Sequence, residues 1–215
     1  MRFTLKQMQP GFPKLFEIND EKNNIIALAK QPDGYKYGEP FLYFAEGEQP
    51  LNLFYVKNQK RGLFKKIFSK YPFLPFKIVG RESDQQIGYF SVHTYKPQNP
   101  FVKYDYIHLN YMSEEYDVYY VGMGLQGHKF PIYKDGKQIG LIEKDCAIYN
   151  GIDEYRIYFL NGTDKNLGSI IALYVDAMFF TNWENYPITY YSNIVKRTVN
   201  KRLLTKYDPY FISKT

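Results

Sequence analysis

Few side chains in this sequence could act as a nucleophile or a general base. They are His93, His108, His128 and the single cysteine, Cys146. His108 lies in the alternating stretch YDYIHL, and a histidine on one face of a strand is more often structural than catalytic. Nothing near Cys146 in the sequence would clearly activate its thiol. We therefore expect no catalytic residue and a protein that is not an enzyme.

Two polar stretches resemble ligand-binding loops without meeting the chemical requirements of one. VGMGLQGH, residues 121–128, has glycines one position short of the dinucleotide-binding spacing, and no long helix follows it. NGTDKN, residues 161–166, has Thr163 and Lys165 where a calcium loop needs carboxylates or amides, and no glutamate closes it. One cysteine also excludes a disulfide framework and a cysteine-rich zinc site. We interpret the two stretches as a loop and a helix cap, and we expect no metal and no cofactor.

The stretch with the clearest binding chemistry is RGLFKKIFSKY, residues 61–71. Its apolar residues recur at helical spacing and fill an arc of about 140° on a helical wheel, with the lysines on the remaining arc. The pattern is typical of a helix that lies on an anionic membrane, and equally of a helix packed on a globular domain. The apolar arc consists of Leu63, Phe64, Ile67, Phe68 and Tyr71.

Positive charge is concentrated in two segments. The chain has a formal net charge of +6, which favours an acidic partner such as a lipid surface or nucleic acid. Residues 57–71 hold six basic side chains and no acidic one, and residues 187–215 hold six more against Asp208 alone. The second segment has a weaker apolar stripe that predicts a helical tail. No compact motif for reading bases accompanies these charges, so nucleic acid is the less favoured partner.

Neither a secretory signal nor a membrane span is visible in the sequence. The first 18 residues contain no apolar core of the kind that a signal peptide needs. The longest apolar run, residues 170–180, is too short to cross a bilayer and contains Asp176. We expect a cytoplasmic protein that is at most peripheral to a membrane.

The framework that must position these segments is predicted to be a β-sheet. Aromatic residues make up 19% of the chain, and they favour strands. Three stretches share a strand, a polar turn and a second strand, which predicts three hairpins. Short aromatic strands flank each hairpin alike, so three units of four strands give about twelve strands. The three stretches are FEINDEKNNIIAL at 16–28, FKIVGRESDQQIGYF at 76–90 and FPIYKDGKQIGLI at 130–142.

One segment, residues 164–180, has the pattern of a helix. Thr163 and Asp164 are plausible caps, and the following residues are apolar on nearly every face. Such a helix must be surrounded by protein. A closed antiparallel barrel of about twelve strands around this helix satisfies both patterns. Asp176 must then find a partner inside the barrel mouth or lie at the helix end near solvent.

These features resemble the tubby C-terminal-like superfamily, which includes tubby proteins, phospholipid scramblases and LURP-one-related proteins. The resemblance rests on the repeated hairpins with QIG closings, on DGKQIGLIEKD followed by DEYRIYFL, and on SIIALYVDAMFF. It covers about residues 1–180 and implies a β-barrel around a core helix. Residues 181–215 would form a basic extension on or beside the barrel. The resemblance implies a fold more clearly than a function: tubby-type members are known as phosphoinositide-binding modules, scramblase-like members are associated with lipid movement and calcium, and many small members have no established role.

The function predicted from these patterns is non-enzymatic binding of an anionic lipid, phosphoinositide-like or with another acidic headgroup, at the membrane surface. The alternative is a soluble protein-interaction or scaffold domain without a lipid ligand, with a protein as its partner. An enzyme or a nucleic-acid binder is the less favoured alternative. The expected lipid-binding residues are Arg61, Phe64, Lys65, Lys66, Phe68, Lys70, Lys196, Arg197 and Lys201.

Overall fold

The computed structural model describes eight stretches of the chain: 1–34, 38–56, 75–95, 104–123, 126–145, 150–160, 164–180 and 203–215. Within them the chain is mainly β, with one α-helix, α2 (Lys165–Phe179), before a short C-terminal segment. The strands are β1 (Arg2–Gln7), β2 (Lys14–Asp20), β3 (Ile25–Gln31), β4 (Phe41–Ala45), β5 (Leu51–Tyr55), β6 (Phe76–Gly80), β7 (Gln86–Tyr95), β8 (Tyr104–Tyr111), β9 (Glu114–Val118), β10 (Val121–Gly122), β11 (His128–Lys134), β12 (Lys137–Lys144) and β13 (Glu154–Phe159).

The strands form one closed antiparallel ring. Neighbours in the chain pair with one another, β13 pairs with β1, and β9 pairs with β11 to close the ring. The extra strand β10 pairs with β11 in the same register as β9, so it continues β9 beyond the break at Tyr119 and Tyr120. The twelve-stranded antiparallel barrel predicted from the sequence is therefore confirmed, with β10 as an addition.

The three predicted hairpins are confirmed as β2–β3, β6–β7 and β11–β12. In each hairpin the pairing register shifts directly after the isoleucine of the F-x-I opening, at Ile18, Ile78 and Ile132. Such irregularities bend a strand and increase its twist, which helps a sheet to close. The shared motif thus encodes a repeated bend of the barrel wall.

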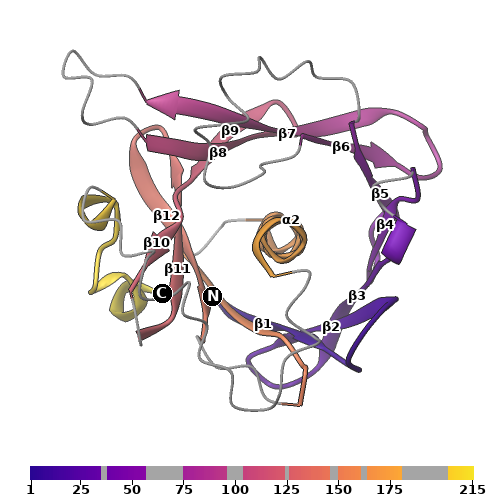
Figure 1. The fold of residues 1–215 in the computed structure, drawn as a ribbon, viewed down its shortest axis with the longest axis horizontal. Coiled ribbons are helices and arrows are strands. Elements are labelled where there is room, and N and C mark those ends of the chain that lie inside the picture. The colour runs from indigo at the N-terminus through magenta and orange to yellow at the C-terminus, as the bar shows by residue number, and fades with distance from the viewer. Residues whose placement is uncertain are drawn as a thin grey trace.

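Helix α2 is buried among the inward side chains of the strands. Figure 1 shows α2 within the ring of strands. The side chain of Asp164 caps the helix by accepting a hydrogen bond from the Asn166 amide at 2.8 Å, as the predicted cap requires. The ring of Tyr174 stacks on Phe90 with centroids 4.1 Å apart and meets the edge of Phe76 at 5.5 Å. Every residue from 166 to 178 is buried.

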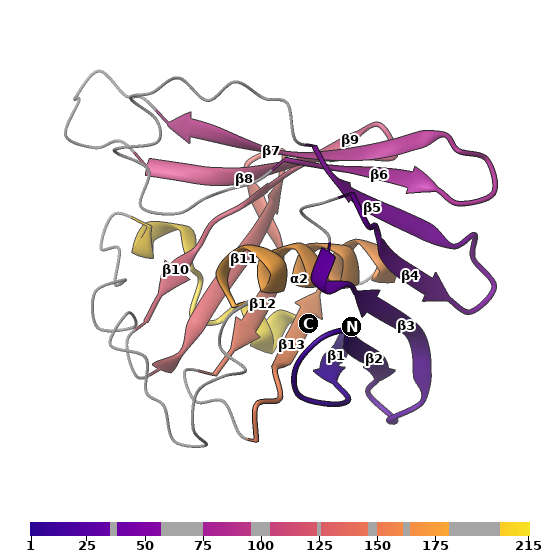
Figure 2. The ribbon, with the colours of Figure 1, turned by 45° about the vertical axis from the view of Figure 1, so that its right-hand side comes forward.

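The antiparallel order gives the barrel two different ends. At the tight-turn end the connections are short, and Figure 2 shows the β4–β5 and β6–β7 turns on the same side of the molecule. At the long-loop end most connections are longer. Helix α2 also ends at the long-loop end, since Asp176 in its last turn contacts Lys14 at the start of β2. The long-loop connections are residues 8–13, 32–40, 56–75, 96–103, 123–127 and 145–153.

The C-terminal segment, residues 203–215, packs against the outside of the barrel. Leu203 joins a cluster with Tyr119 and Val121, and Phe211 packs with Leu141 and Tyr158. Its helices are short 3₁₀ turns, Leu204–Lys206 and Phe211–Lys214, where the sequence predicts a longer helical tail. The predicted basic helix at 61–71 and the tail residues 181–202 lie outside the described residues.

We expect Gly168→Ala to destabilise the protein by about 1–3 kcal/mol because the site is already filled. A Cβ at this position would lie 2.5 Å from Phe159 Cε2 and 2.8 Å from both Ile157 Cγ2 and Phe3 Cζ. This overpacking should outweigh the gain of about 1 kcal/mol in helix propensity. Urea unfolding measures the change. Lys165→Ala, at the partly exposed start of the same helix, is the control and should change stability by less than about 0.5 kcal/mol.

Candidate functional site

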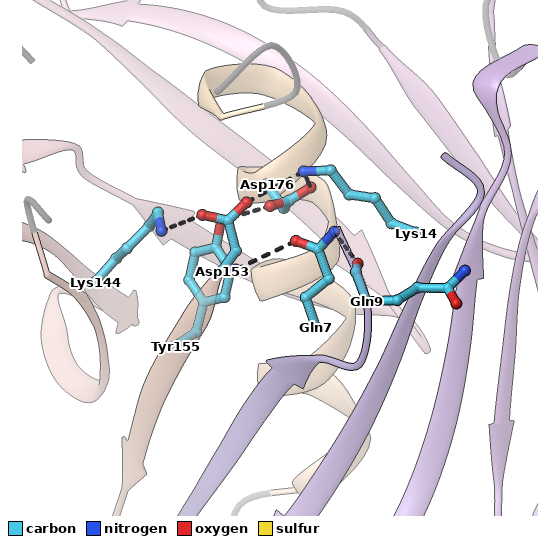
Figure 3. A network of polar contacts seen from close by, with 7 residues as sticks. All are labelled: Gln7, Gln9, Lys14, Lys144, Asp153, Tyr155 and Asp176. Atoms are coloured by element: carbon cyan, nitrogen blue, oxygen red, sulfur yellow. Dashed lines mark hydrogen bonds and ion pairs between the residues drawn. The ribbon is translucent and has the colours of Figure 1, made fainter. Parts of the chain in front are cut away.

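Four charged side chains are buried together at the long-loop end of the barrel (Figure 3). They are Lys14 at the start of β2, Lys144 at the end of β12, Asp153 before β13 and Asp176 in the last turn of α2. Their side chains are at most 2% exposed. Burying charges in this way is tolerated only when they are paired and hydrogen-bonded. We call these four residues, together with Tyr155, the buried charge network.

Each carboxylate oxygen of the network accepts a hydrogen bond. Nζ of Lys14 donates to Oδ2 of Asp176 at 2.9 Å and to Oδ2 of Asp153 at 3.2 Å. Nζ of Lys144 donates to Oδ1 of Asp153. The hydroxyl of Tyr155 donates to Oδ1 of Asp176 at 2.7 Å. Two cations and two anions thus balance each other inside the barrel.

Neighbouring groups hold the network in place. The amide nitrogen of Asp153 donates to Oε1 of Gln7 at 3.2 Å, and Nε2 of Gln7 donates to the carbonyl of Gln9 at 2.6 Å. Nζ of Lys144 lies 5.1 Å from the ring centroids of both Tyr155 and Phe180, a distance at which aromatic rings stabilise a cation. Lys144 is therefore held by a carboxylate and by two aromatic faces.

The two buried carboxyl groups differ in acidity. Burial alone would raise the pKa of Asp153, but the ammonium groups of Lys144 and Lys14 outweigh burial and lower it. Burial is the largest influence on Asp176 and raises its pKa against the opposing effect of Lys14. The sequence left two possibilities for Asp176, and the structure shows the first: Asp176 is hydrogen-bonded inside the barrel mouth.

The network has no exposed group with which to act on a substrate from solution. No cluster of three or more histidine, cysteine or acidic side chains among the described residues could hold a metal ion. The hydrogen bonds and ion pairs of the network join β2, β12, β13 and α2 at one end of the barrel.

His128 is the second buried ionisable site at this end. Its Nδ1 lies 2.8 Å from the hydroxyl of Tyr120, and its ring meets the edge of Phe180. Burial, followed by the positive charges of Lys144 and Lys129, lowers the pKa of His128 to about 3. The imidazole is therefore neutral in the native protein at neutral and mildly acidic pH.

All nine residues predicted to bind lipid lie outside the described residues. The chain on either side of residues 57–74 is described: Tyr55 pairs with Phe76, and the amide of Val56 donates to the carbonyl of Pro75 at 2.9 Å. The chain therefore leaves the described barrel after Val56 and returns to it at Pro75, and these two residues are neighbours on the long-loop end. Residues 181–202 follow Phe180 at the same end.

Charge is divided between the described barrel and the segments outside it. The described residues contain 15 of the 28 lysines and arginines and 21 of the 22 acidic residues. The described part is thus formally acidic although the whole chain is basic. Segments joined to the long-loop end, residues 57–74, 96–103 and 181–202, hold most of the remaining basic residues.

An aromatic strip on the outer face of β7, β8 and β11, which includes Tyr119 between β9 and β10, was not predicted. Its rings contact one another in series: Tyr95–Tyr104 at 4.9 Å, Tyr106–Tyr119 at 5.3 Å and Tyr119–Tyr133 at 5.3 Å between centroids. The ring of His93 stacks on His108 at 4.2 Å, and Nδ1 of His108 lies 2.9 Å from Asp117 Oδ1. The alternation of Tyr104, Tyr106 and His108 was the available signal, since alternate residues of a strand share a face.

Comparison with known proteins identifies no relative of this chain. No protein-family model, curated protein or solved structure matches it. Among the residues that the structure describes, no helix combines the length and apolar character needed to cross a membrane.

We predict that Lys144→Met lowers the free energy of unfolding by about 3–5 kcal/mol. The substitution keeps the volume of the side chain but leaves Asp153 with one fewer cation in a buried site, which is strongly destabilising. Chemical denaturation at neutral pH measures the loss. Lys137→Met, at the exposed start of the same strand, is the matched control and should change stability by less than about 0.5 kcal/mol. Equal effects of the two variants would contradict the prediction.

His128 should make the protein less stable as the pH falls below about 6.5. In the unfolded chain the imidazole of His128 binds a proton near its ordinary pKa of 6.5, whereas in the native protein it binds one only near pH 3. Between these values His128 contributes a loss of at most about 1.4 kcal/mol per pH unit. In His128→Gln this part of the dependence of unfolding free energy on pH should disappear. The unfolding free energies of the unmodified protein and the variant should therefore converge as the pH falls.

Urea unfolding between pH 7 and pH 4 tests this dependence. The exposed His93, changed to Gln, is the control and should retain the slope of the unmodified protein. Parallel pH profiles for the unmodified protein and His128→Gln would show that His128 is not the cause.

Proposed function

We propose that this protein is a non-enzymatic binding module that attaches to an anionic lipid surface through the long-loop end of its barrel. The observation that carries the proposal is that basic and acidic residues are distributed unequally between the two ends of the barrel. Both segments rich in basic residues, 57–74 and 181–202, are joined to the long-loop end. An anionic surface facing that end would meet the basic segments and not the acidic remainder of the molecule.

The turns at the opposite end support this orientation. They carry many carboxylates, which an anionic surface would repel. Basic residues near an anionic leaflet contribute about 1 kcal/mol each, and Phe64 and Phe68 would add burial of apolar surface. The acidic residues at or beside the tight turns include Asp20, Glu21, Glu46, Glu48, Glu82, Asp84, Glu114 and Asp135.

The architecture also supports a proposed membership of the tubby C-terminal-like superfamily. A twelve-stranded antiparallel barrel with a late apolar helix is the fold that the resemblance implies. The resemblance does not assign ligand residues one by one. Under this proposal we therefore place the lipid contacts at the basic segments on the evidence of this chain's own sequence.

A second candidate function, protein interaction, rests on the aromatic strip. Tyr95 is 46% exposed at one end of the strip. At the other end Nζ of Lys206 lies 4.8 Å from the ring centroid of Tyr119 and 5.2 Å from that of Tyr133. The strip thus already binds one cationic side chain of its own chain, and a basic segment of a partner would use the same chemistry.

Co-sedimentation with lipid vesicles tests the lipid proposal. We expect the protein to bind vesicles that contain anionic phospholipid, not neutral vesicles, and to bind less as salt rises from about 50 to about 150 mM. Phe64→Asp combined with Phe68→Asp should reduce binding to the level seen with neutral vesicles, because two new charges oppose insertion.

The matched control places the same two charges at the opposite end of the barrel. Ile25 and Met112 are 51% and 60% exposed near tight turns, and changing both to Asp should leave vesicle binding unchanged. Absence of binding under all these conditions would leave protein interaction as the remaining candidate.

A further inference from the structure

The contact between Lys14 and Asp176 has the geometry of a reactant pair as well as that of an ion pair. Nζ of Lys14 lies 2.9 Å from Oδ2 of Asp176, and neither side chain is exposed. The fold has therefore already brought an amine and a carboxyl group into contact in a dry site. Such positioning is a large part of what makes intramolecular reactions fast.

Two further side chains stand where amide formation would need them. The hydroxyl of Tyr155 donates to Oδ1 of Asp176 at 2.7 Å, so it can stabilise negative charge that develops on that oxygen. Oδ2 of Asp153 lies 3.2 Å from Nζ of Lys14, within reach of the proton that the nitrogen must lose. The four groups together make a nucleophile, an electrophile, a proton carrier and a hydrogen-bond donor.

We propose that Lys14 and Asp176 condense to form an isopeptide bond that joins β2 to α2. A proton first passes within the pair, giving a neutral amine and a carboxylic acid. The lone pair of Nζ attacks Cγ of Asp176, and a C–N bond forms while Tyr155 holds Oδ1. Asp153 takes a proton from the nitrogen and delivers it to Oδ2, the Cγ–Oδ2 bond breaks, and water leaves. The reaction needs no oxidant, reductant or co-reactant.

The product retains the hydrogen bonds of the site with fewer buried charges. The new amide N–H can donate to Asp153, and its carbonyl keeps the bond from Tyr155. Lys144 and Asp153 remain as one balanced ion pair. Removing a buried cation and a buried anion relieves their desolvation cost, which is several kcal/mol per ion. The raised pKa of Asp176 favours the acid form that is attacked.

The same geometry selects Lys14 over Lys144 as the nucleophile. Nζ of Lys144 lies 5.1 Å from two ring centroids, whereas Nζ of Lys14 lies 6.0 Å from one, that of Phe12, so aromatic contact stabilises the protonated, unreactive form of Lys144 more strongly. The carboxyl group that Lys144 contacts, Asp153, has a lowered pKa, so it is ionised before the reaction begins and is a poor electrophile. The observations therefore point to the 14–176 pair.

Mass spectrometry of the intact, denatured protein tests the proposal. After incubation for days at 37 °C, the expected mass is about 18 Da, one water, below that of the sequence. Trypsin should release a branched peptide in which residues 7–22, uncleaved at Lys14, are joined to residues 166–196. A protein that retains the full sequence mass overturns the proposal. So does an 18 Da loss without the branched peptide, which would place the dehydration elsewhere.

Three variants define the role of each group. Lys14→Met should abolish the mass loss, whereas Lys30→Met, on the exposed side of the adjacent strand β3, should retain it. Tyr155→Phe keeps both reacting groups and the aromatic ring, so it should fold and condense several-fold more slowly. Condensation at an unchanged rate in Tyr155→Phe would remove Tyr155 from the reaction. If Lys14→Met fails to fold, the mass of the unmodified protein still decides the question.

Discussion

The structure depends on filling the inside of a twelve-stranded ring. A ring of this size is too wide for its own inward side chains to fill, so another element must occupy it. Helix α2 meets this need with residues that are apolar on all faces, and its buried positions belong to one cluster with the inward residues of the strands. Gly168 lets the helix approach Phe159 closely, and Tyr174 packs on Phe76 and Phe90. The size of the barrel thus dictates an unusually apolar helix.

The carboxylate in that helix determines the structure of the long-loop end. Asp176 lies within the apolar stretch, so the barrel must supply a cation, and Lys14 occupies that position. Lys14 also contacts Asp153, which in turn contacts Lys144. Each charge requires the next one because an unpaired buried ion costs several kcal/mol. One acidic residue therefore accounts for a network that joins three strands to the helix.

The repeating parts of the fold were predictable from the sequence, and the contacts between distant residues were not. Alternation, hairpin motifs and caps are local patterns, so they predicted the twelve strands and the bounds of the helix within a residue or two. Lys14 is 162 residues from Asp176 and 139 from Asp153. A lysine at the start of a strand ordinarily extends into solvent. Only the closed register, which brings β1, β2 and β13 together, makes it a buried partner.

The sequence predicted the proposed lipid-binding residues as part of two basic segments, and all nine of them lie outside the described residues. The topology nevertheless constrains their position, since an antiparallel ring returns every second connection to the same end. The dipole of helix α2 is oriented in agreement with the charges at the two ends of the barrel. The N-terminus of the helix is at the acidic, tight-turn end, and its C-terminus is near Lys14 and Lys144. A helix dipole favours anions near the first end and cations near the second.

Because of this separation of charge, the acidic barrel and an external anion compete for the basic segments. The described barrel is formally acidic, so the basic segments are attracted both to their own barrel and to any external anion. Attraction between exposed charges fades over about 10 Å at 0.1 M salt, so an anionic surface must come close to compete. Under the lipid proposal, a leaflet would do so because it presents many charges side by side, whereas the acidic turns of the barrel lie mainly at its opposite end. Under the lipid proposal, an extended anionic surface is therefore a stronger competitor than a single small anion.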